Sequence, residues 1–188
     1  MENSFYTTDE LKKIGFKHIG NGCKISRYAR FYSVNKIAIG NNVRIDDFCI
    51  LSGKIEIGNY IHIAAYSALY GGEEGIYIND YANLSSRVSI YSVSDDYSGE
   101  SMTNPMVPDK YKEVLSHSVY IGKHVIIGAT SVVMPGVVLA EGSSFGSFSY
   151  IDHDSELWSI NVGIPFKKIK NRSRNVLELE KRFAKEQL

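Results

Sequence analysis

Two adjacent carboxylates are the residues of this chain best suited to acid-base chemistry. Asp95 and Asp96 stand in "SVSDDYSGE", residues 92–100, which interrupts an otherwise regular chain, and "GGEEG" contributes Glu73 and Glu74. A carboxylate of ordinary pKa is a weak base toward a hydroxyl, but crowded carboxylates raise one another's pKa. We therefore treat Asp95 and Asp96 as candidate catalytic residues.

Histidines supply further candidates, because imidazole titrates near neutral pH. His62 closes the segment "IGNYIH", at a corner of the expected fold, and is a candidate general base. His117, in the return of a long irregular segment, is the rival base. We expect His124 on an outer face of the molecule, and His18 and His153 on its surface.

A six-residue repeat indicates the scaffold that must position these groups. From Ile39 the chain divides into units such as "IGNNVR", "IDDFCI", "LSGKIE" and "IGNYIH", and a similar run begins at Ile121. The first and fifth places of each unit are mostly apolar or small, and in a strand they point to the same side. Gly, Asn and Asp between them turn the chain at low cost. Stacked units bury one continuous core, so the sequence predicts an all-β solenoid.

The repeat, with the later stretches "HVIIGATSVVMPGVVL", "FGSFSYI" and "VGIPFKKIK", resembles the hexapeptide-repeat acyltransferases. This resemblance covers about residues 19–155 and implies a left-handed parallel β-helix with three hexads per coil. Within the family, the chain is most similar to the branch that acylates sugars, such as nucleotide-linked amino sugars of the dTDP-4-amino-4,6-dideoxyglucose type or galactosides. The resemblance implies an acetyl-CoA-dependent transferase acting on a sugar hydroxyl or amino group, in lipopolysaccharide or other surface-polysaccharide biosynthesis.

With three hexads per coil, the two acidic segments fall at the same corner of successive coils. We therefore expect Glu73 and Glu74 to lie near Asp95 and Asp96. The hexad is lost altogether over residues 91–118. A loop this long within a compact fold is usually functional, and it can also pack on a neighbouring subunit.

The resemblance also implies how the acceptor is held. Trimers of this family enclose acceptor and coenzyme between adjacent β-helices, so we expect a homotrimer. Many relatives have a histidine where this chain has Asp95. We therefore expect His62 to act as the base, with Asp95 or Asp96 of the adjacent chain orienting its ring or binding the acceptor. An amine acceptor would depend less on a general base than a hydroxyl would, because a neutral amine is already nucleophilic. Further acceptor contacts are expected from Glu73, Glu74, Tyr97 and His117.

The coenzyme site follows from the same resemblance. "IGATS" and "FGSFS" resemble the turns whose backbone groups bind the pantetheine arm, and the exit segment "VGIPFKKIKNR" carries basic residues suited to phosphates. The expected coenzyme contacts are Ala129, Ser147, Pro165, Lys167, Lys170 and Arg172.

Length and composition bound these interpretations. The 188 residues divide into an N-terminal segment (1–18), the β-helix with its inserted loop (19–155) and an extension with a short helix (156–188). Acidic and basic residues number 21 each, which gives no reason to expect a nucleic acid or an anionic membrane as partner. Without an apolar membrane span or a secretory signal, a cytoplasmic protein is expected.

Two alternatives to an acyltransferase stay open at this point. A zinc enzyme of the γ-carbonic-anhydrase kind shares the solenoid, but it needs three converging histidines, and the spacing of His62, His117 and His124 matches this poorly. We therefore expect no metal. A non-catalytic scaffold is the second alternative, against which the long loop and the coenzyme-like exit segment argue. The acceptor, its attacking atom and the preferred acyl chain are not fixed by the sequence.

Overall fold

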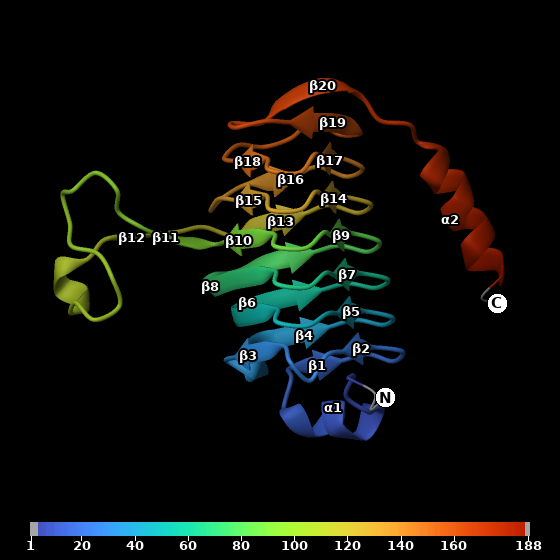
Figure 1. Cartoon of the computed structure of the whole chain (residues 1–188), viewed down its shortest axis with the longest axis horizontal. Coiled ribbons are helices and arrows are strands. Elements are labelled where there is room, and N and C mark those ends of the chain that lie inside the picture. Colours follow the sequence, from blue (N-terminus) through green and yellow to red (C-terminus); the bar gives the residue numbers. More distant parts are fainter. Residues whose placement is uncertain (1–3, 187–188) are drawn as a thin grey trace.

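The protein is a triangular parallel β-helix, seen in a computed structural model that describes residues 4–186 (Figure 1). Partners in successive coils are eighteen residues apart, as in the pairing of Ile39 with Ile57 and of Ile45 with Ile63. Three hexads therefore make one coil, and the strands of successive coils pair in parallel. The predicted all-β solenoid is confirmed.

The strands fall on three faces, which we call sides one, two and three. Side one contains β1 (His18–Ile19), β4 (Ile37–Ile39), β13 (Val119–Ile121) and β16 (Val138–Leu139). Side two contains β2 (Lys24–Ile25), β5 (Arg44–Ile45), β7 (His62–Ile63), β9 (Asn83–Leu84), β14 (Ile126–Ile127), β17 (Ser144–Phe145) and β19 (Ser159–Val162). Side three contains β3 (Arg30–Tyr32), β10 (Ser89–Tyr91), β15 (Val132–Val133) and β18 (Tyr150–Ile151). Two longer strands run from side three round the corner onto side one: β6 (Ile50–Ile57) and β8 (Ala68–Ile78).

The core is built from the first and fifth places of the hexads. Ile39, Ile45, Leu51 and Ile63 each have 0 % of their surface exposed. Several fifth places hold serine, and the hydroxyls of Ser67 and Ser131 donate to backbone carbonyls of a neighbouring coil, those of Ser85 and Gly146, each at 3.2 Å. A buried hydroxyl with such a partner carries little penalty.

The corners stack into three edges, which we name by the sides that they join. Along the one-two edge, Tyr60, Tyr81, His124 and Trp158 adopt left-handed backbone conformations with φ of 51° to 61°. This conformation is unfavourable for L-residues. Stacking between coils offsets the cost, since the rings of Tyr60 and Tyr81 lie 5.2 Å apart and those of Tyr81 and His124 lie 5.1 Å apart.

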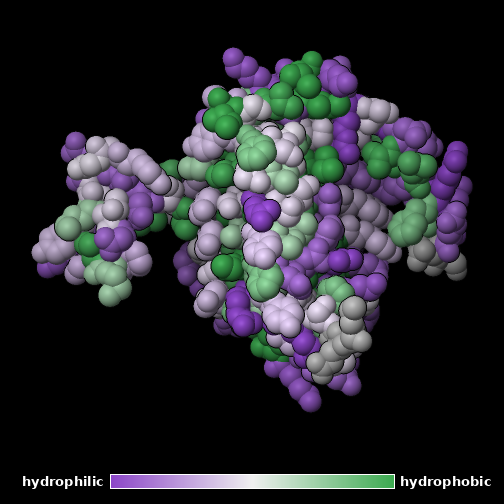
Figure 2. Space-filling model, viewed as in Figure 1, coloured by the Kyte–Doolittle hydropathy of each residue, from purple (hydrophilic) through white to green (hydrophobic). Residues whose placement is uncertain are grey.

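Residues 93–116 leave the solenoid at the three-one edge as a protruding β-ribbon, which we call the arm. Its base pairs β11 (Val93–Asp95) with β12 (Val114–Ser116) in antiparallel fashion, and its far part contains a 3₁₀ turn, η2 (Asp109–Tyr111). Figure 2 shows the arm standing clear of the body, with hydrophobic and hydrophilic residues mixed on its surface. The segment without hexads is therefore an ordered extension.

Other elements cover the ends and one edge of the solenoid. Helix α1 (Thr8–Ile14) closes the N-terminal end, with a second 3₁₀ turn, η1 (Val34–Lys36), nearby. Strand β20 (Lys167–Asn171) crosses the other end, and helix α2 (Asn175–Glu186) then runs back along the solenoid (Figure 1). The predicted C-terminal helix is present, whereas α1 was not predicted. No helix within residues 4–186 is long and apolar enough to cross a membrane.

Glu10 fastens α1 to the first coil and predicts a pH dependence of stability. Its carboxylate accepts hydrogen bonds from Arg27 at 2.7 and 2.9 Å and from the backbone nitrogen of Thr7 at 2.7 Å. These bonds, chiefly that from Arg27, lower the pKa of Glu10 from 4.5 to about 2. Folding therefore favours the ionised form, and this contribution is complete above about pH 4.5 and is lost as the pH falls toward 2.

We accordingly expect Glu10→Gln to be less stable than the wild type at pH 7, and this difference should shrink steadily as the pH is lowered from 4.5 to 2. Urea unfolding of both proteins across this range measures the difference and removes the effects of the other carboxylates, which both share. A difference that stays constant with pH would contradict the assignment.

Candidate functional site

A groove of about 1130 Å³ lies between side three and the base of the arm. Tyrosines from three coils form its floor, and Val93, Val114 and Pro105 of the arm form its wall. The floor residues are Tyr70, Tyr91, Val132, Met134 and Tyr150. The lining is therefore mostly apolar and aromatic, and Asp95 is the carboxylate among the residues that line it. A groove with few polar groups of defined position is typical of a small-molecule site.

The adjacent carboxylates of the arm have different surroundings. Asp96 accepts hydrogen bonds from the backbone nitrogens of Ser98 at 2.8 Å and of Ser101 at 3.0 Å. Hydrogen bonds from Ser98 and then from Ser101 lower the pKa of Asp96 to about 2. This shift is opposite to the mutual raising expected from the sequence. Asp96 therefore stabilises a turn of the arm, whereas the Asp95 carboxylate accepts no hydrogen bond from the part of the chain that the structure describes.

The "GGEEG" glutamates do not join Asp95 and Asp96, which corrects the expected acidic cluster. The Glu73 carboxylate accepts two hydrogen bonds from Lys36 Nζ, at 2.6 and 2.8 Å, and this contact lowers the pKa of Glu73. Glu74 uses its backbone carbonyl, which accepts from Ser118 Oγ at 3.1 Å. Neither glutamate is among the residues that line the groove. Tyr97, by contrast, lines the groove with Asp95.

His62 lies on side two with a carboxylate partner from its own chain. Its Nε2 is 2.7 Å from Asp46 Oδ2, and Asp46 Oδ1 accepts from Arg44 Nε at 2.6 Å. Burial raises the pKa of Asp46, but the hydrogen bonds from His62 and Arg44 outweigh it, and the pKa is lowered overall. The His62 side chain is 41 % exposed, so its ring is both oriented and accessible. An imidazole oriented by a carboxylate is suited to general-base work.

Sequence reasoning missed Asp46 and two polar residues beside His62. Asn83 pairs with His62 in register on the next coil, and Ser85 follows two residues later, just beyond the end of β9. All three side chains are partly buried. Register across coils would have placed Asn83 beside His62. Register would not have found Asp46, because the register partner of His62 on the preceding coil is Arg44. Asp46 stands two residues after Arg44 and reaches His62 diagonally.

Four of the expected coenzyme residues share the two-three edge or adjoin it. Ala129 and Ser147 occupy this edge in successive coils, where the Phe148 nitrogen donates to the Ala129 carbonyl at 2.9 Å. Gly163 stacks above them, since its carbonyl accepts from the nitrogen of Tyr150 at 3.0 Å. Pro165 follows directly, and Lys167 begins β20 opposite Val162. Glycine is required at position 128 of this edge, because a Cβ there would collide with the backbone of Ser147.

The antiparallel pairing of β19 and β20 separates the basic residues of the exit segment. Lys170 pairs with Ile160 in the middle of side two, and Asn171 pairs with Ser159 at its far end. Arg172 therefore reaches the one-two edge, where its Nη1 donates to the carbonyls of His124 at 2.7 Å and Gly142 at 3.0 Å. Burial lowers the pKa of Arg172. This placement corrects the expectation that Arg172 binds a coenzyme phosphate.

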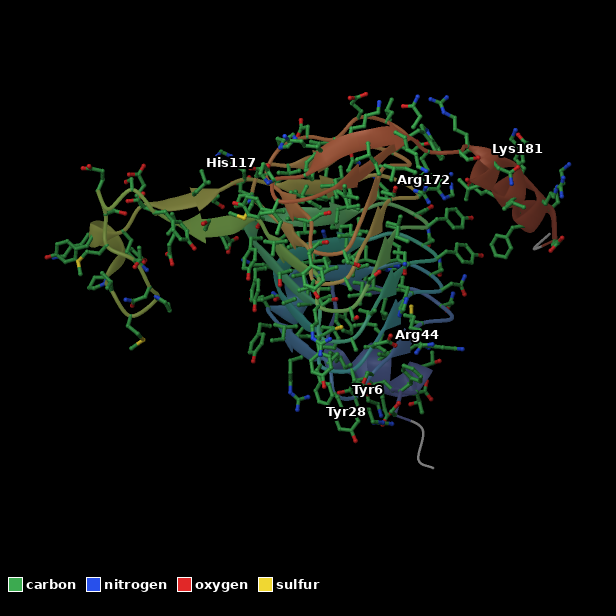
Figure 3. The ribbon with its side chains drawn as sticks, turned by 45° about the horizontal axis from the view of Figure 1, so that its top comes forward. Tyr6, Tyr28, Arg44, His117, Arg172 and Lys181 are labelled. Atoms are coloured by element: carbon green, nitrogen blue, oxygen red, sulfur yellow. The ribbon has the colours of Figure 1, made fainter. Side chains whose placement is uncertain are left out.

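The remaining histidines lie apart from one another. His117 is exposed at the root of the arm (Figure 3), where its nitrogen donates to the Ser92 carbonyl at 3.0 Å. His124 is only 5 % exposed, which corrects the expected outer position, because α2 covers it and Glu180 Oε2 lies 2.8 Å from its Nε2. His18 and His153 are exposed as expected. Within residues 4–186, no three His, Cys, Asp or Glu side chains form a group that could hold a metal ion.

Comparison with known proteins identifies the family of this chain. A model of the bacterial transferase hexapeptide (six repeats) matches residues 118–153. The dTDP-4-amino-4,6-dideoxy-D-glucose acyltransferase of Escherichia coli is 52 % identical over 177 residues, which cover 93 % of this chain and 92 % of that protein. The chain belongs to the hexapeptide-repeat acyltransferases.

Solved structures agree with this assignment. The N-acyltransferase AntD from Bacillus cereus, in complex with dTDP and 3-hydroxybutyryl-CoA, has 52 % identity and a TM-score of 0.97, covering 98 % of this chain and 98 % of that one. A galactoside acetyltransferase in complex with coenzyme A has 19 % identity and a TM-score of 0.59, covering 92 % and 76 %, and shares the fold.

These findings decide between the interpretations that the sequence left open. The protein is an acyltransferase with the left-handed β-helix of its family, and the structures of AntD contain coenzyme A or an acyl-CoA. The zinc-enzyme and scaffold alternatives are therefore wrong.

Proposed function

We propose that this acyltransferase moves an acyl group from acyl-CoA to the 4-amino group of dTDP-4-amino-4,6-dideoxyglucose. The observation that carries the proposal is a carboxylate, Asp95, in an aromatic groove, in a chain 52 % identical to a protein named for this acceptor. A crystal structure of AntD also contains that sugar nucleotide together with coenzyme A. A carboxylate without a cationic partner suits an amino group, which it can hold by a charge-assisted hydrogen bond.

Substitutions made in AntD support Asp95 as a residue of this site. Its crystal structures include variants of one serine and of one aspartate that stand ten positions apart. Ser85 and Asp95 have the same separation here, as do Ser86 and Asp96. The Asp96 carboxylate serves a turn inside the arm, whereas Asp95 lines the groove. This difference favours Ser85 and Asp95 as the counterparts.

A homotrimer would complete the site. Within one chain the arm leaves the three-one edge, whereas His62, Asn83 and Ser85 lie along side two, the face opposite that edge. The arm also carries side chains too exposed for a lone chain, with Tyr97 92 % and Met106 90 % exposed. Such residues are typical of an interface. In the proposed trimer, the arm of one subunit covers side two of the next and brings Asp95 opposite His62.

The reaction then needs few protein groups. The amine nitrogen attacks the thioester carbonyl, the carbon–sulfur bond breaks, and coenzyme A leaves as its thiol after a proton has moved from nitrogen to sulfur. Asp95 is assigned to orient the amine, and the His62 ring, held by Asp46, to accept its proton or relay it. Ala129, Ser147, Pro165, Lys167 and Lys170 are assigned to the coenzyme. We place the enzyme in the cytoplasm, where acyl-CoA and nucleotide sugars are available.

Mass spectrometry of the product tests the acceptor. Purified protein with acetyl-CoA and dTDP-4-amino-4,6-dideoxyglucose should give the N-acetylated nucleotide sugar, and dTDP-glucose, with a hydroxyl in place of the amine, should give no product. Acylation of dTDP-glucose at a similar rate, or of free galactosides alone, would overturn the proposed acceptor and leave the family assignment intact.

The coenzyme assignment predicts a charge effect at the exit strand. Lys170→Glu should raise the Kd of acetyl-CoA about tenfold or more, because it replaces an attraction to phosphate by a repulsion. Lys167→Ala should raise it less. Isothermal titration calorimetry measures both. Lys168→Ala is the matched control, since Lys168 lies between them but is paired with Glu156 at 2.6 Å. Equal affinity of Lys170→Glu and wild type would remove Lys170 from the site.

A further inference from the structure

The strand that carries the coenzyme lysines has little support of its own. All five residues of β20 are exposed, and its ladder partner is β19, with a register shift between Ile160 and Asn161. The strand closes the end of the solenoid, so no further coil covers it (Figure 1). A short, exposed, irregular strand frays easily unless both of its ends are fixed.

One end of β20 is fixed by the turn at the two-three edge, and the other by Arg172. The guanidinium of Arg172 donates from Nη1 to the carbonyls of His124 and Gly142, with Ser143 at 3.4 Å, and the Arg172 nitrogen donates to the Trp158 carbonyl at 2.6 Å. These carbonyls belong to the corners that precede β14, β17 and β19. Charge-assisted bonds from the side chain to two coils, with a backbone bond to a third, fix the position of Arg172 closely.

Helix α2 closes over this anchor. Glu180 Oε1 accepts from Lys123 Nζ at 2.6 Å, and Glu180 Oε2 lies 2.8 Å from Nε2 of the buried His124. The Phe183 ring meets the Tyr60 ring edge-on at 5.2 Å. Because α2 begins three residues after Arg172, these contacts hold the chain on the C-terminal side of the arginine.

We propose that Arg172 is a positioning residue for the coenzyme, which fixes β20 so that Lys167 and Lys170 reach the phosphates. This inference rests on the proposed coenzyme site. Arg172 does not itself contact coenzyme at the two-three edge, because five steps of extended chain, roughly 16 Å at about 3.3 Å per residue, separate it from Lys167. Figure 3 shows it near α2, on the opposite side of the solenoid from the arm.

Steady-state kinetics with acetyl-CoA as the varied substrate test the inference. Arg172→Ala should raise the KM of acetyl-CoA about five- to tenfold, leave the KM of the sugar nucleotide unchanged, and change kcat less than about twofold. Arg172→Lys keeps the charge but has fewer donors, so its acetyl-CoA KM should lie between those of the wild type and Arg172→Ala. Glu180→Gln should also raise the KM of acetyl-CoA. Arg182→Ala on α2 is the control and should match the wild type.

A double-mutant cycle separates positioning from direct contact. If Arg172 acts through β20, Arg172→Ala should add little to the effect of Lys167→Ala combined with Lys170→Ala. Fully additive effects would overturn the inference in favour of a direct phosphate contact. An unchanged acetyl-CoA KM in folded Arg172→Ala and Arg172→Lys would overturn it too, while the lysine effects would still support the coenzyme site. Absence of any lysine effect would overturn both.

Discussion

Replacing Asp95 by asparagine should lower kcat about 10²- to 10³-fold, and the KM of acetyl-CoA should change less than about twofold. Asparagine keeps the size of the side chain but removes the negative charge that holds the amine and supports its loss of a proton. The coenzyme is assigned to another edge of the solenoid, so its binding should be unaffected. Coupled detection of free thiol at saturating acetyl-CoA measures the change.

Asp96→Asn is the matched control, because it makes the same chemical change at the next residue. It removes the acceptor of the hydrogen bonds from Ser98 and Ser101 and should loosen the turn of the arm, with a loss of kcat below about tenfold. If Asp96→Asn were as damaging as Asp95→Asn, the assignment of the two carboxylates to different roles would be wrong. If neither variant lost activity, the arm would contribute structure alone.

Removal of the His62 ring should have the second largest effect. We expect His62→Ala to lower kcat about 10²-fold, because the proton of the attacking nitrogen would lose its acceptor, and Asp46→Asn to lower it about tenfold by releasing the ring. His153→Ala, an exposed histidine paired with Asp152, is the control. Wild-type turnover in His62→Ala would remove His62 from the mechanism.

Mixed subunits test whether Asp95 and His62 of different chains share a site. Co-refolded or co-expressed Asp95→Asn and His62→Ala chains should recover activity that neither variant has alone, since about a quarter of the sites in random trimers combine two unaltered surfaces. Size-exclusion chromatography with light scattering should give a trimer in each case. Complete absence of recovery in mixed trimers would place both residues of a site in one chain.

Periodicity made the scaffold predictable from sequence. Places one and five of each hexad must both point inward for a strand to bury them, so the repeat alone indicates which residues, such as Ile45 and Leu51, form the core. The three-hexad coil then predicts which residues are neighbours across coils. Ala129 and Ser147 fall at one edge for this reason, as the structure bears out.

The site residues outside the repeat were harder to predict. Asp96 and Glu73 were expected to lie close together. Instead Asp96 accepts a hydrogen bond from Ser98, and Glu73 accepts one from Lys36. These contacts lie in irregular segments that the hexad repeat does not describe. Arg172 lies beyond the last coil, where the chain reverses direction, and an antiparallel return carries it away from the edge at which it would have met phosphate. Charge in a sequence shows which ligands a residue could bind but not which partner reaches it first.

The stacking of coils also fixes the distance, along the solenoid axis, between residues on different coils. Successive parallel strands are about 4.8 Å apart, so the height between the coil that carries the arm and those that carry Ala129 and Ser147 is a whole number of such steps. Adding or deleting a coil in that interval would shift the sugar from the thioester by more than a bond length. Coils on the N-terminal side of β7 lie outside this interval, so we expect insertion of one coil there to preserve activity and insertion between β10 and β17 to abolish it.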